Sequence, residues 1–170
     1  MLTCMAYVDL NPVRAGACKT LDEAEFTSIY ARLKEASRRM DEARAQEPAP
    51  QAADEEGSTA PAGLAPFADQ AAAEGDPSTL PMLFADYLHL LEWTGRAVRH
   101  GAGWLRGPEP AVMSRMGIEP EAWLRTMSSH GIQSLSALGS AEQLEALAVS
   151  REKKRVRGQG WARKMYSRAA

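Results

Sequence analysis

A segment rich in proline, alanine, glycine and acids, residues 47–79, constrains the fold of this 170-residue chain more than any other feature. Proline and glycine recur along it, as Pro48, Pro50, Gly57, Pro61, Gly63, Pro66, Gly75 and Pro77. Its only large apolar side chains are Leu64 and Phe67. Such a segment buries too little apolar surface to offset the entropy that a chain loses on ordering. We therefore expect a disordered acidic linker over 47–79, with a helical part on either side.

The part before the linker, residues 1–46, has the pattern of two helices. The first ten residues contain no glycine or proline, and Asn11-Pro12 predicts that a helix ends there, because proline disfavours the α conformation of the residue before it. A second helix is expected to begin near Thr20, which has the spacing of a capping box with Glu23. Its apolar face, at helical spacing, comprises Phe26, Ile29, Tyr30 and Leu33.

The part after the linker, residues 80–170, is expected to be a helical domain with a basic tail. Either Ser78 or Thr79 would cap its first helix, Pro120 would lie in the first turn of a second, and Ser140 would start a third. The last helix would carry Trp161 among basic residues. No segment alternates in the manner of a strand, so the predicted fold class is mainly α.

Charge is distributed unevenly, although the formal net charge is only −2. The last twenty residues hold a single acid, Glu152, and eight bases, Arg151, Lys153, Lys154, Arg155, Arg157, Arg163, Lys164 and Arg168. A basic segment on a near-neutral protein either binds phosphate or is a solvated helix, and the charges alone leave both interpretations open. The candidate nucleic-acid-binding residues are Lys153, Lys154, Arg155, Arg157, Arg163 and Lys164. Tryptophans usually pack in cores, and Trp161 is the best exception because single-strand binders place aromatic rings among bases.

Targeting signals are not evident in the sequence. No apolar run reaches the length of a membrane-spanning helix. The first residues lack the basic and apolar regions of a secretory signal. Cys4 and Cys18 have no partners at metal-binding spacing. We therefore expect a cytoplasmic protein with free thiols and no membrane partner.

Residues 6–16 form the most distinctive motif, and read Ala-Tyr-Val-Asp-Leu-Asn-Pro-Val-Arg-Ala-Gly. The motif resembles a hallmark of the REP-associated tyrosine transposases, which belong to the HUH single-strand DNA transposases. Residues 26–29 are similar to the next segment of that family, and residues 86–90 and 93–96 are similar to the C-terminal extension of one of its branches. The resemblance covers roughly 2–35 and 80–125. It implies DNA transposition, with single-stranded or hairpin DNA as the partner and, in full-length members, a homodimer as a candidate assembly.

The resemblance also implies roles for individual residues. Tyr7 would be the catalytic nucleophile and Asn11 an auxiliary metal ligand, whereas Arg14 would contact DNA phosphate. Tyr7 and Asn11 are four residues apart and so share one face of a helix. A phenol can attack a phosphodiester that a divalent metal polarises, and hard cations such as Mg²⁺ or Mn²⁺ prefer oxygen ligands.

Ordinary structural interpretations of the same residues stay open. A tyrosine at the end of an apolar helix is usually a packing residue, and asparagine before proline is usually a stop signal. Arg14 equally suits a helix cap or an ion pair.

The sequence departs from the family at its metal site. The family binds its metal through two histidines in a His-hydrophobe-His strand, whereas His89, His100 and His130 are far apart here. We therefore expect a truncated chain that lacks the strand-rich half, holds no metal and is inactive alone, so its status as an enzyme is open. The missing half supplied by another chain, a helical DNA-binding module without catalysis, and a decayed reading frame are the alternatives.

Overall fold

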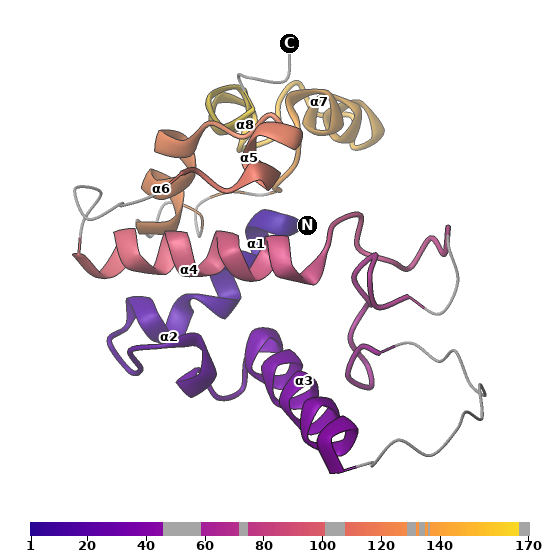
Figure 1. Ribbon diagram of the computed structural model, residues 1–170. Coiled ribbons are helices and arrows are strands. Elements are labelled where there is room, and N and C mark those ends of the chain that lie inside the picture. The colour runs from indigo at the N-terminus through magenta and orange to yellow at the C-terminus, as the bar shows by residue number, and fades with distance from the viewer. Residues whose placement is uncertain are drawn as a thin grey trace.

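The computed structural model describes residues 1–45, 59–71, 75–100, 108–128, 132, 135 and 137–166. Within this part of the chain the fold is mainly helical, as predicted (Figure 1). An isolated parallel bridge between Phe67 and Leu80 is the only strand-like pairing among the described residues. No described helix combines the length and the apolar character needed to cross a membrane.

The N-terminal part forms α1 (Leu2–Asp9), α2 (Asn11–Arg14), the 3-10 turn η1 (Leu21–Glu23) and α3 (Ser28–Ala45). The first helix ends before Asn11-Pro12, as predicted. A short helix then begins there at once, because proline in a first turn lacks only an N–H that would have no intrahelical partner.

The second predicted helix begins eight residues later than expected, at Ser28. The Glu23 carboxylate accepts the backbone N–H of Lys19 at 2.8 Å, so this pair builds a turn rather than a helix start. The cap of α3 comes from Thr27, whose hydroxyl accepts the N–H of Tyr30 at 3.3 Å, and from Asp9. Phe26 precedes the cap with φ of 65° and is 100% exposed, so its predicted place on the apolar face is wrong.

The linker expectation is wrong for the part that the structure describes. Phe67 is completely buried, with its ring centroid 5.4 Å from that of Phe84 and 5.3 Å from that of Tyr87. The Arg32 guanidinium lies 4.5 Å from the Phe67 ring centroid and donates to the Ala65 carbonyl at 2.8 Å. One aromatic side chain and one arginine thus hold a segment whose composition predicted disorder.

Backbone contacts close the same segment onto the helix that follows it. Leu80 N–H donates to the Pro66 carbonyl at 2.7 Å. The Asp69 carboxylate accepts the N–H of Phe84 at 2.8 Å, so α4 (Phe84–His100) begins there and is not capped by Ser78-Thr79. The remaining linker residues, 47–58 and 72–74, lie outside the described residues.

Helix α4 lies between the N-terminal helices and the C-terminal group (Figure 1). It packs against α2 on one side and, on the other, against α5 (Ala111–Arg115) and α6 (Pro120–Ser128). One cluster of buried apolar residues extends from Leu2 to Met165. The described residues therefore share one core, whereas the sequence predicted two parts separated by a linker.

The C-terminal helices follow the sequence prediction closely. Pro120 opens α6, and Ser140 caps α7 (Ala141–Ser150) in a full capping box with Gln143. The last described helix, α8 (Gln159–Met165), carries Trp161. Its indole N–H donates to the Thr126 hydroxyl of α6 at 2.8 Å.

We predict that Phe67→Ala lowers the free energy of unfolding by about 3 kcal/mol, because it empties a fully enclosed aromatic site. Leu64→Ala is the matched control, since this second apolar linker residue is only half-buried and its loss should cost less than about 1 kcal/mol. Urea denaturation followed by circular dichroism measures both. Equal, small effects would show that the linker is not part of the core.

Candidate functional site

Three apolar side chains fix the helices that carry the motif. Ala6, Leu10 and Val13 are buried in the core. Their spacing places them on one side of α1 and α2, which leaves Tyr7 and Arg14 half-buried at the edge of the core and Asn11 exposed. The motif therefore folds so that Tyr7, Asn11 and Arg14 lie at the edge of the core, whereas its acid, Asp9, is buried.

Tyr7 and Arg14 form a direct pair. Arg14 Nη2 donates to the Tyr7 hydroxyl at 3.1 Å, and the guanidinium carbon lies 4.1 Å from the centroid of the Tyr7 ring. The sequence offered phosphate contact, a cap or an ion pair for Arg14, and the structure shows a bond to the phenol, which the sequence analysis did not predict. Such stacking is worth about 0.5–2 kcal/mol, so the pair holds the phenol in one orientation.

The second terminal nitrogen of Arg14 is buried and has no hydrogen-bond partner among the described residues. Guanidinium groups donate in a fixed fork that matches the oxygens of phosphate. One arm of Arg14 is thus bonded to the phenol oxygen, and the other is enclosed by the protein. The same donor favours negative charge that develops on the Tyr7 oxygen.

The structure does not assemble a metal site around Asn11. Within the described residues no three His, Cys, Asp or Glu side chains gather in a way that could hold an ion. The nearest acid along the chain, Asp9, is only 1% exposed and is bonded elsewhere. The described residues around Asn11 therefore do not by themselves supply the ligands of the divalent metal that the resemblance implies.

Asp9 is the residue that the sequence analysis missed. Its carboxylate accepts the N–H groups of Ser28 and Ile29 at 2.9 and 3.2 Å, and the Tyr87 hydroxyl at 2.6 Å. The available signal was an acid in an otherwise apolar helix. Because a buried charge needs partners, such an acid predicts bonds to neighbouring elements. Asp9 thereby fixes the helix of Tyr7 against α3 and α4.

The six candidate basic residues are all exposed. Lys154, Arg155 and Arg163 line one groove of about 530 Å³, whereas Lys164 lines a neighbouring one. Arg163 also pairs with Glu145 of α7 at 3.3 Å. The structure therefore groups four of these residues near α8, and Lys153 and Arg157 line neither groove.

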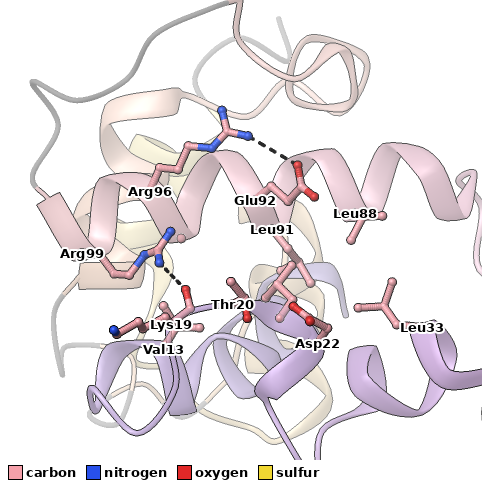
Figure 2. Close-up of a pocket in the computed structure, with 12 residues that line it drawn as sticks. Val13, Lys19, Thr20, Asp22, Leu33, Leu88, Leu91, Glu92, Arg96 and Arg99 are labelled. Atoms are coloured by element: carbon pink, nitrogen blue, oxygen red, sulfur yellow. Dashed lines mark hydrogen bonds and ion pairs between the residues drawn. The ribbon is translucent and has the colours of Figure 1, made fainter.

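A third pocket, of about 370 Å³, lies between α4 and the segment from Val13 to Asp22 (Figure 2). Leucines line it and charged side chains form its rim. Arg96 pairs with Glu92 at 3.5 Å, and Arg99 donates to the carbonyl of Lys19. The bond from Arg99 joins the loop before η1 to α4.

Comparisons of the chain with protein-family models, with curated proteins and with solved structures found no match. The resemblance to the transposases therefore depends on the residues of the motif.

We predict that the stability contributed by Tyr87 is lost in alkali. Burial and the neighbouring Asp9 carboxylate raise the pKa of Tyr87. The folded protein therefore keeps the phenol proton that the unfolded chain releases above pH about 10, and the free energy of unfolding falls by up to about 1.4 kcal/mol per pH unit. Tyr87→Phe should reduce this slope, measured by urea denaturation at pH 8 and 11. Identical slopes in both proteins would contradict it.

We predict that Arg14 makes Tyr7 a reactive phenol. An aryl sulfonyl fluoride should label Tyr7, and Arg14→Leu should slow this by about tenfold, the worth of one hydrogen bond to a charged group. Peptide mass spectrometry measures the labelling, with Tyr30 as the internal reference. Arg115→Leu is the matched control, because it removes an exposed arginine that pairs with Asp86. Equal labelling of Tyr7 in the wild type and Arg14→Leu would contradict the role.

Proposed function

We propose that this chain is a cytoplasmic protein of the REP-associated tyrosine transposase type, which contributes Tyr7 as the nucleophile for cleavage and joining of single-stranded DNA. The observation that carries the proposal is the hydrogen bond from Arg14 to the Tyr7 hydroxyl within the motif of residues 6–16. It places a cationic donor directly on the oxygen of a half-buried phenol. This arrangement suits attack on a phosphodiester more than it suits a packing tyrosine.

The reaction would form one bond and break one bond. The Tyr7 oxygen attacks phosphorus and loses its proton, while the bond from phosphorus to the 3′-oxygen breaks and that oxygen leaves as a hydroxyl. The product is a 5′-phosphotyrosine link, and joining is the reverse step with a new 3′-hydroxyl. Arg14 would hold a non-bridging phosphate oxygen and orient the phenol.

The isolated chain is not expected to catalyse this reaction. The three histidines lie at positions 89, 100 and 130, so the sequence has no His-hydrophobe-His pair. Asn11 alone is one neutral oxygen ligand, which is too few for a hard divalent cation. The metal-binding residues would have to be supplied to Tyr7 from elsewhere.

A second candidate function is a helical DNA-binding module without catalysis. The grouping of Lys154, Arg155, Arg163 and Lys164 in two grooves near α8 favours it. The two candidates differ in the residue on which they depend, since only the first requires Tyr7. A protein with no nucleic-acid role is the outcome if neither set of residues affects DNA binding.

We predict that the isolated chain forms no covalent adduct with DNA. The assay incubates it with single-stranded hairpin DNA and Mg²⁺ or Mn²⁺, and denaturing electrophoresis detects any protein–DNA adduct. The expected result is none, because the sequence has no His-hydrophobe-His pair and Asn11 alone cannot hold a catalytic metal. An adduct that disappears in Tyr7→Phe would contradict the prediction and would show that the ligands come from the chain itself.

A further inference from the structure

The groove between α6 and α8 combines an aromatic ring with cationic side chains. Its volume is about 620 Å³, and Trp161 and Lys164 of α8 and Arg125 of α6 contribute to its lining. Helices α6 and α8 lie side by side in the C-terminal group (Figure 1). An aromatic ring flanked by cations is the combination that binds unpaired nucleotides, through base stacking and phosphate contacts.

Trp161 is held rigidly within this groove. Its indole N–H donates to the Thr126 hydroxyl, which itself donates to the Ala122 carbonyl at 2.7 Å. Its ring meets that of Tyr166 edge to face, with centroids 6.2 Å apart. The donor of the indole is thus already bonded, and the half-buried ring presents apolar surface to the groove.

A second groove continues the first along α8. Lys154 and Arg155 line it, and its volume is about 530 Å³. The two grooves share Arg163 and Gly160. Apart from its chain neighbours and the backbone of its own helix, nothing lies within 4 Å of the position that a Cβ on Gly160 would occupy, so the junction between the grooves is open.

Cations outnumber acids along the joined grooves. The cations are Arg125, Lys154, Arg155, Arg163 and Lys164, and the acids are Glu119, Glu121 and Glu145. Two of the acids make ion pairs, Glu145 with Arg163 at 3.3 Å and Glu121 with Arg125 at 3.9 Å. These pairs are exposed and therefore weak, so a phosphate can displace them.

We propose that the joined grooves over α8 bind single-stranded DNA, with one base stacked on Trp161 and phosphates against Lys164 on one side and Lys154 and Arg155 on the other. A base within a duplex is already stacked and cannot reach Trp161, which is why the ligand is a single strand. The proposal depends on the proposed function only for the choice of DNA, and Tyr7 has no part in it.

The first test introduces a charge at the junction. Gly160→Asp places a carboxylate in open space where the grooves meet, and it should weaken binding to oligothymidylate of about 12 nucleotides by at least tenfold. Gly160→Asn is the matched control with the same shape and no charge, and its affinity should stay within about threefold of the wild type. Fluorescence anisotropy of the labelled strand against the full chain, over a salt series, measures affinity.

The second test separates stacking from charge. Trp161→Leu should weaken binding about 5- to 150-fold, which is the loss expected for one stacked base. Trp161→Tyr keeps an aromatic ring and should recover most of the affinity. Both variants keep the same charge, so the slope of affinity against salt should not change. Circular dichroism of each variant checks that the fold is retained.

The outcomes decide the proposal. Unchanged affinity in both Gly160→Asp and Trp161→Leu would overturn it, as would equal affinity for duplex and single strand. Tighter binding of oligouridylate than of oligothymidylate would overturn the choice of DNA. Tyr7→Phe should bind like the wild type, so failure of the nucleophile proposal leaves this site intact. Loss of binding in Tyr7→Phe alone would assign the strand to the Tyr7 site instead.

Discussion

The buried carboxylate of Asp9 is the interaction on which the arrangement of the helices depends. It lies at the end of α1, accepts two backbone N–H groups at the start of α3 and accepts the hydroxyl of Tyr87 from α4. Removing one partner of a buried charge typically costs about 3–5 kcal/mol, so the three helices are held to one geometry. Tyr7 lies two residues before Asp9, and its position at the surface is therefore set by contacts that it does not itself make.

Local signals predicted the helices whose caps are local, and failed where a cap comes from far along the chain. Ser140 and Gln143 cap α7 from within three residues, and the sequence pattern was sufficient there. The N–H of Ser28 is bonded by a residue 19 positions earlier, and that of Phe84 by one 15 positions earlier. Composition failed over the linker for a related reason. Composition describes the average of a segment, whereas the ordered structure around residue 67 depends on one buried side chain, Phe67.

The sequence predicted which residues belong to the candidate site, but it did not predict that Arg14 would bond to Tyr7. Helical spacing predicted that Tyr7 and Asn11 share a face, because the two are one turn apart. Spacing does not predict which side chain contacts the Tyr7 hydroxyl. Arg14, seven residues and about two helical turns further along the chain, makes that contact. The sequence likewise showed that basic residues are concentrated in the last twenty positions, near α8. Their division between two grooves follows from how α8 packs on α6 and α7, which no local pattern encodes.

Three separate side-chain hydrogen bonds link, helix by helix, the helix of Tyr7 with α8. The Tyr87 hydroxyl donates to Asp9 and links α4 to α1, the Trp123 indole donates to Thr94 at 2.9 Å and links α6 to α4, and the Trp161 indole donates to Thr126 and links α8 to α6. Each bond joins successive helices of the core, and the donors of the first two lie completely buried. Buried hydrogen bonds of this kind select one packing arrangement, because any other leaves a polar group unpaired. The distance between the phenol of Tyr7 and the ring of Trp161 is consequently a fixed property of the fold.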